Sequence, residues 1–260
     1  MKKLFTALML TGVFMANAVE IQNDQWDKKA RQSKNDPAAM TISNKVVIYS
    51  VAAPYIPVDT AKKYRLSGSF RLVKPLAEKP GKLKFGIQTY DQNKRPILPE
   101  HTTVINNTAT TLVSAAEYGQ RKVTIANGKR WRIVPNFSYI AFNTKDDFSD
   151  LPNRSTIAIT GIKVLPDGKA ELELKEPLRE FYPAGSNVRM HHRLASFLYG
   201  GALNRDLTED YQEFSGVFTG EQRGMSHNIF RKGTAFIQIV VMIEGNGTLE
   251  FKNIKFEEIQ

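Results

Sequence analysis

Cysteine is absent from this 260-residue chain, and histidine and tryptophan are scarce, with four and two residues. Without cysteine there can be no disulfide, thiolate metal ligand or cysteine nucleophile, so a packed core must supply the stability, and the chain is long enough to bury one. The sequence also lacks a Gly-x-Ser-x-Gly elbow, a phosphate-binding glycine loop and a His-x-x-x-His pair. We therefore expect no catalytic residue and no catalytic zinc. A glycosidase carboxylate pair stays open, because its spacing is spatial rather than sequential.

Long apolar segments are missing everywhere except at the N-terminus. There, Leu4–Met15 follows Lys2 and Lys3 and precedes the small-residue motif Ala16-Asn17-Ala18. This three-part pattern predicts a secretory signal peptide over residues 1–18. The apolar run is shorter than the ~20 residues that span a bilayer. We therefore expect no transmembrane segment, and we expect export to the periplasm or secretion from the cell.

Acidic residues are outnumbered, with 26 against 36 basic residues and a net charge of +10. Removing the signal peptide with Lys2 and Lys3 leaves 34 − 26, a net charge near +8. Such a charge suits an anionic polysaccharide, a phosphate-rich envelope or an acidic partner, and it equally serves solubility. No block of like charge is present, so we expect no nucleic-acid partner.

The remaining pattern is that of strands. Apolar residues alternate over 63–73 and 82–90, the period of a half-buried strand. Residues 235–244 are apolar on both parities, which indicates a central strand covered on both faces. Asn127-Gly128 and Asp167-Gly168 are turn dipeptides typical of hairpins. We predict an all-β protein, an antiparallel β-sandwich or jelly roll.

The predicted domain organisation is simple. Residues 19–37 form a polar lead-in, in which Trp26 is the one large apolar residue that can dock on the body. Residues 38–260 form a single β-sandwich domain. The 104–187 region exceeds what a minimal jelly roll needs, and we expect it to elaborate one sheet.

Three segments carry a family resemblance. Tyr64–Arg71 reads YRLSGSFR, Phe85–Asp91 reads FGIQTYD, and a third, C-terminal group comprises Phe214–Phe218, Phe230–Thr234 and Gly247–Ile254. They resemble exported carbohydrate-binding modules of the galactose-binding-domain-like jelly-roll type, at the two ends of the domain only. Lys94 stands where these modules usually have glycine. The resemblance implies glycan binding, no cofactor, and a structural calcium near the chain ends, for which Glu20, Asp24, Glu257 and Glu258 offer oxygens.

Sugar binding requires exposed aromatic faces beside planar polar groups, with arginine added for anionic sugars. Two stretches, 129–132 and 182–199, combine these residue types. Arg189, His191 and Arg193 share one parity and would line one face of a strand. A buried tryptophan and a solvated strand face explain the same pattern. The ligand-binding candidates are Trp131, Arg132, Tyr182, Arg189, His191, Arg193 and Tyr199.

An enzyme alternative comes from the segment Phe230–Gln238. It resembles the final motif of alginate-lyase-type jelly rolls, with Lys232 and Gln238 at the family's spacing, but Phe236 replaces the tyrosine that would transfer a proton. Three functions therefore remain open: non-catalytic glycan binding, a structural or partner-binding envelope role, and a polysaccharide lyase or hydrolase. Glycan binding predicts exposed aromatic rings, whereas the structural alternative predicts that Trp131, Tyr182 and Tyr199 are buried.

Overall fold

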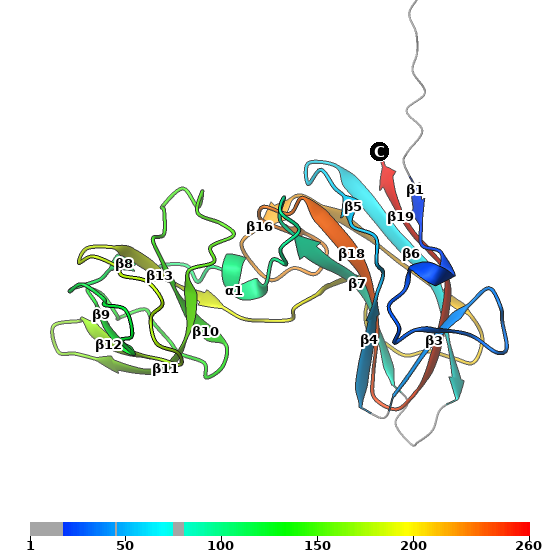
Figure 1. The fold of residues 1–260 in the computed structure, drawn as a ribbon, viewed down its shortest axis with the longest axis horizontal. Coiled ribbons are helices and arrows are strands. Elements are labelled where there is room, and N and C mark those ends of the chain that lie inside the picture. The colour runs from blue at the N-terminus through cyan, green and yellow to red at the C-terminus, as the bar shows by residue number, and fades with distance from the viewer. Residues whose placement is uncertain (1–17, 45, 75–80) are drawn as a thin grey trace, which may run out of the picture.

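A computed structural model describes residues 18–44, 46–74 and 81–260. The described residues form two lobes side by side, with the helix α1 (Pro99–Thr102) at their junction (Figure 1). The first lobe, the body, contains both ends of the described chain. The second lobe is inserted between two body strands, β7 (Lys82–Tyr90) and β14 (Leu198–Arg205).

The body is a sandwich of two antiparallel sheets. One sheet has the order β15-β6-β19-β3-β2, with β1 also paired to β19; the other has the order β14-β7-β18-β4, with β5 also paired to β18. Apart from β7 and β14, the bounds are β1 Ala18–Glu20, β2 Arg31–Gln32, β3 Met40–Asn44, β4 Val47–Val51, β5 Ile56–Pro57, β6 Lys63–Lys74, β15 Gln212–Thr219, β18 Phe236–Glu244 and β19 Gly247–Ile259.

The core of the body lies between these sheets. Phe70 of β6 and Phe85 of β7 meet there with ring centroids 4.7 Å apart. Residues 237–243 of β18 are all buried, which confirms the prediction of a strand covered on both faces. Trp26 is also buried and packs edge-on against Phe251 of β19 at 4.9 Å, so the lead-in docks on the body as expected. A short 3-10 helix, η1 (Asn23–Gln25), precedes it.

The second lobe is one sheet of order β8-β13-β10-β11-β12-β9. Bridge pairing between Leu112, just after β8, and Ile125 of β9 joins the two ends of this order, so the sheet curls around its own core. Closing a sheet in this way removes exposed strand edges. The bounds are β8 Thr110–Thr111, β9 Lys122–Ile125, β10 Ser138–Phe142, β11 Thr156–Val164, β12 Ala170–Leu174 and β13 Asn187–His192.

The all-β sandwich predicted from the sequence is confirmed. From the sequence, the 104–187 region is expected to elaborate one sheet of a single domain; in the structure it has a separate hydrophobic cluster around Trp131 and Phe142. Asp167-Gly168 turns the β11–β12 hairpin as predicted. Asn127-Gly128 does not form a hairpin, because β9 pairs with β12 and no strand follows the turn directly.

Two further strands, β16 (Glu221–Gln222) and β17 (Phe230–Arg231), form a small parallel pair near the junction. No helix within the described ranges is long and apolar enough to cross a membrane. The predicted signal peptide lies outside the described residues except for Ala18, and it stays a prediction.

Candidate ligand-binding surfaces

The three aromatic rings that the sequence offered for sugar stacking are buried. Trp131 is 1% exposed, and its indole nitrogen donates to the carbonyl of Thr108 at 3.0 Å. Tyr182 is 4% exposed and stacks on Phe142 at 4.2 Å. Tyr199 is 7% exposed. Trp131 and Tyr182 are core residues of the second lobe, so neither offers a ring face to a ligand, and this correction favours the structural alternative for both.

Arg189 and His191 lie side by side on β13, as their parity predicted, but the face that they share is covered by α1 and the 145–150 segment instead of being open to solvent. Arg189 is 3% exposed and donates from Nη2 to Asp150 Oδ2 at 2.5 Å and from Nη1 to the carbonyl of Lys145 at 3.0 Å. Its Nε donates to Nε2 of His191 at 2.9 Å. Burial lowers the pKa of Arg189, although Asp150 opposes this effect. The three side chains form a buried polar network rather than a solvated face.

His191 is held in one tautomer by this network. Its Nε2 accepts from Arg189, so Nδ1 carries the hydrogen and donates to the carbonyl of Glu100 at 2.7 Å. Burial lowers the pKa of His191 to about 4. A protonated ring would direct an Nε2 hydrogen at the Arg189 guanidinium, so the network requires the neutral form.

The two exposed arginines on the candidate list have separate partners. Arg132 donates to the carbonyls of Lys129 and Trp131, each at 3.1 Å. Arg193 lies 3.9 Å from a carboxylate oxygen of Glu100 and donates to the hydroxyl of Tyr139 at 3.3 Å. The contacts of the second lobe thus do not assemble the seven candidates into one site.

Asp91 and Arg231 join the lobes at their junction. Asp91, at the end of β7, pairs with Arg154 of the second lobe at 2.8 Å. Arg231 is buried and donates to the carbonyls of Ile97, Ala195 and Ser196, which belong to the two connecting segments. These contacts tie both crossings of the chain to the body.

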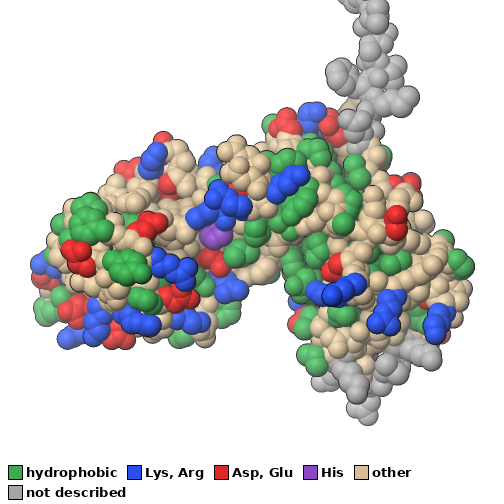
Figure 2. All heavy atoms as spheres, in the orientation of Figure 1, with side chains coloured by type: hydrophobic (Ala, Val, Ile, Leu, Met, Phe, Trp, Pro, Cys, Tyr) green, Lys and Arg blue, Asp and Glu red, His purple; other side chains and the backbone are tan. Residues whose placement is uncertain are grey.

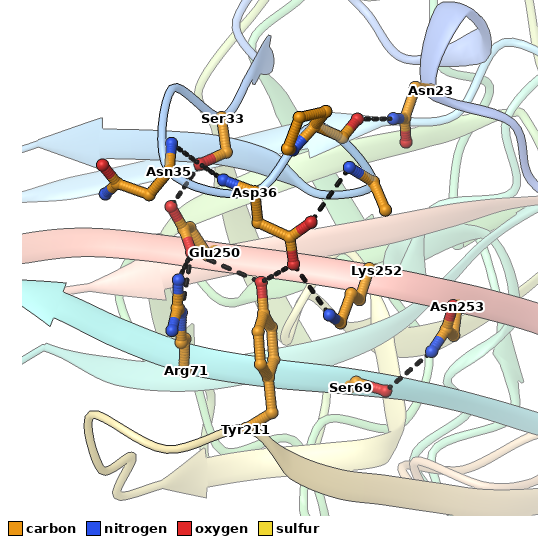
Figure 3. Close-up of polar contacts among 12 residues, drawn as sticks. Asn23, Ser33, Asn35, Asp36, Ser69, Arg71, Tyr211, Glu250, Lys252 and Asn253 are labelled. Carbon is orange, nitrogen blue, oxygen red and sulfur yellow. Dashed lines mark hydrogen bonds and ion pairs between the residues drawn. The ribbon is translucent and has the colours of Figure 1, made fainter.

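A second polar network covers the outer face of the first body sheet (Figure 3). Glu250 of β19 is 1% exposed; Arg71 of β6 donates to it at 2.6 and 2.7 Å, and Ser33 of the lead-in also bonds it. Tyr211 bridges Glu250 and Asp36, at 3.3 and 3.1 Å. The carboxylates are thus occupied by protein groups, and the network fastens the lead-in to the sheet.

We expect Arg71→Met to lower the free energy of unfolding by about 1–3 kcal/mol, because Glu250 would stay buried without its cation. Thermal unfolding in a Trp131→Phe background, followed by the fluorescence of Trp26 in the lead-in, measures this loss. The matched control is Arg65→Met, because Arg65 pairs with Glu257 at 3.6 Å on the exposed surface and should change stability by less than ~1 kcal/mol. If the two variants lowered the free energy of unfolding equally, the buried Arg71–Glu250 pair would not be a special source of stability.

Six aromatic residues lie on the outer face of the second body sheet. We call this surface the aromatic face. Ring contacts between 4.9 and 6.5 Å join its members into two groups: Tyr55 with Tyr90 and Phe236, and Phe197 with Tyr49 and Tyr199. Tyr49 and Tyr55 are 37% and 38% exposed. Hydrophobic side chains gather over the body next to the junction, with Lys and Arg side chains beside them (Figure 2).

Three lysines make cation–π contacts with tyrosines of this face. The ammonium of Lys29 lies 4.0 Å from the Tyr49 ring centroid, and that of Lys94 lies 5.1 Å from the ring of Tyr55. Lys84 lies 5.6 Å from the ring of Tyr199. Within the described ranges, Lys94 has no carboxylate at ion-pair distance, whereas Lys29 and Lys84 have Asp27 and Glu244. No single stretch of the sequence reveals this surface, because its rings come from separate strands and loops.

The predicted calcium site gains no support from the carboxylates that were expected to form it. Glu258 pairs with Lys62 at 2.9 Å and Glu257 with Arg65 at 3.6 Å. Over residues 18–44, 46–74 and 81–260, no group of three or more His, Cys, Asp or Glu side chains could hold a metal ion. The calcium therefore stays a prediction.

Comparison with known proteins gives no family. No family model matches the chain, and no curated protein matches it. A crystal structure described as that of A. japonicus CB05 is similar at a TM-score of 0.23 and 10% sequence identity, over 94% of this chain and 34% of that one. The chain thus spans about a third of that protein's length, and a likeness this low carries no argument.

Proposed function

We propose that this chain is a non-catalytic glycan-binding protein, exported by its signal peptide, whose aromatic face binds a polysaccharide. The observation that supports this proposal is two exposed rings on this face: Tyr55, which contacts half-buried Tyr90 and Phe236, and Tyr49, which contacts half-buried Phe197. Exposed rings on a rigid sheet offer apolar area to the C–H faces of sugars without ordering a flexible side chain. Lys94, which lies over the Tyr55 ring and has no carboxylate at ion-pair distance within the described ranges, favours an anionic polymer.

The double variant Tyr49→Ala, Tyr55→Ala tests this proposal. At ~0.5–1.5 kcal/mol per ring, the two rings contribute about 1–3 kcal/mol, so we expect the affinity to fall about 5- to 150-fold. The measurement is retention of the chain from Val19 on a panel of polysaccharides, including xylan, galactan, pectate and alginate, at low and physiological salt. Because both rings are more than a third exposed, the melting temperature should change little.

The control is Tyr118→Ala, because Tyr118 is 77% exposed and lies on the second lobe. This variant should bind like the parent protein. Retention of the double variant equal to that of the parent would remove the aromatic face as the glycan site. Retention that is lost at physiological salt for every polymer would reflect only the net charge.

A structural or partner-binding role is the second candidate, and the burial of Trp131 and Tyr182 favours it. This role predicts no retention on any polysaccharide and capture of an envelope protein instead. An enzyme has less support. Tyr90 donates to Gln238 at 2.5 Å, but burial raises the pKa of Tyr90 to about 12, which opposes its use as a base.

A further inference from the structure

A cavity of about 370 Å³ opens in the second lobe, above the buried Arg189 network. This volume falls in the range of about 300–1,000 Å³ that is typical of small-molecule sites. Three segments line it: the residues before β8, the residues after β10, and β13. The cavity therefore lies beside β13, where the segments next to its two neighbouring strands meet the buried guanidinium of Arg189.

The lining of this cavity offers unoccupied polar groups. Asn106 and Asn107 are exposed at its rim, and their side-chain amides form no hydrogen bond with any residue of the described ranges. Lys145 lies at the same rim, opposed by Asp146. Arg189 is part of the wall; three of its N–H groups reach His191, Lys145 and Asp150, which leaves two of the ~5 hydrogens that a guanidinium carries.

Phe148 forms an aromatic wall held in an unusual conformation. Its φ of +60° lies in the left-handed region, which bulky residues rarely adopt. The guanidinium of Arg223, from the body, lies 3.6 Å from its ring centroid, and that of Arg189 lies 5.0 Å away. Backbone strain of this kind persists where the surroundings impose it, and it often marks a ligand site. Asn107 shares the left-handed conformation, with a φ of +62°.

We infer that this cavity binds a single sugar residue that carries a carboxylate, a uronic acid, at the end or along the chain of a glycan. Amide groups pair with sugar hydroxyls through both their donors and their acceptors, and the two remaining N–H groups of Arg189, with the exposed ammonium of Lys145, offer hydrogen-bond donors to the carboxylate. The cavity lies in the second lobe, whereas the aromatic face lies on the body. The inference rests on the proposed function in one respect only, the choice of a glycan as the ligand class. Together the two surfaces would let one molecule hold a polymer at two points, which raises avidity without new contacts.

The test is calorimetric titration of the chain from Val19 with methyl uronides of the gluco, galacto and manno series at physiological salt. We expect at least one uronide to bind at least tenfold more tightly than its neutral methyl glycoside. Ala109→Trp, which fills the cavity from its rim, should abolish this binding. Asn107→Gly with Lys145→Met should weaken it at least tenfold and leave the melting temperature unchanged, because glycine keeps the left-handed backbone.

The matched control is Asn136→Gly, an exposed left-handed asparagine of the same lobe that does not line the cavity, and it should bind normally. The Tyr49→Ala, Tyr55→Ala variant should also bind the uronide normally, so failure of the aromatic face and failure of this site are distinguishable. Absence of saturable uronide binding, equal binding of the neutral glycosides, or binding unaffected by Ala109→Trp would overturn the inference.

Discussion

Asp150→Ala is expected to destabilise the second lobe by about 3–5 kcal/mol. Removal of one partner from a buried ion pair leaves the other charge uncompensated in a medium that solvates it poorly. The side chains of Asp150 and Arg189 are 7% and 3% exposed, and Arg189 has no other carboxylate at ion-pair distance within the described ranges. Arg189→Met should cost a similar amount, because it strands Asp150 and removes the donor to His191.

Each lobe contains one tryptophan, Trp26 in the body and Trp131 in the second lobe, so the loss can be assigned to a lobe. In a Trp26→Phe background, urea unfolding followed by fluorescence reports on the second lobe alone. The double variant Asp150→Ala, Arg189→Met should recover part of the loss, since neither charge is then left unpaired.

The matched control is Arg179→Met. Arg179 pairs with Glu176 at the same kind of distance, 2.8 Å, but the two side chains are 82% and 59% exposed, so the change should stay below ~1 kcal/mol. If Arg189→Met left the unfolding midpoint unchanged and only weakened glycan retention, Arg189 would be a ligand contact on an open face, as the sequence alone suggested.

Acid should destabilise the protein as the pH falls from 6.5 to about 4, because buried His191 and half-buried His101 must stay neutral in the folded state. Burial lowers the pKa of both His101 and His191 from 6.5 to about 4, so the folded state keeps these rings neutral while the unfolded state protonates them. The free energy of unfolding is therefore highest above pH 6.5, where each ring is neutral in both states. It decreases as the pH falls toward the folded-state pKa, because only the unfolded state binds the proton readily. At ~1.4 kcal/mol per pKa unit, the loss by pH 4 is about 3 kcal/mol for His191 and less for His101, which is less completely buried.

Urea unfolding in the Trp26→Phe background at pH 7.5, 5.5 and 4.5, with Trp131 as the reporter, measures this dependence. His191→Gln should flatten the profile, since a glutamine oxygen can accept from Arg189 and does not protonate in this range. His227→Gln is the control, because its ring is only partly buried and its pKa is lowered less. The carboxylates of Asp36 and Asp91 have pKa values lowered below 3.8, so they act at lower pH. A parent profile that is flat from pH 7 to 4.5 would show that the rings are not protected from protonation.

The sequence by itself determined the strands with the clearest apolar pattern, because their signal is local. Alternation over 82–90 identifies β7, and the doubly apolar run 235–244 identifies β18 and its central place, since a side chain's face follows from its position in a two-residue period. The pairing of Arg189 with His191 on one face followed from the same rule. Trp26, as the one large apolar residue of a polar segment, could be expected to dock.

Only the tertiary structure decided which face of each strand meets water and which distant residues meet there. Asp150 lies 39 positions before Arg189 in the chain, and no local pattern links them. The aromatic face collects rings from β4, β7, β18 and the residues around β5 and β14, so no stretch of sequence displays it. Whether a ring or a guanidinium is a ligand contact or part of the core depends on burial, and burial is set by chain segments far apart in the sequence.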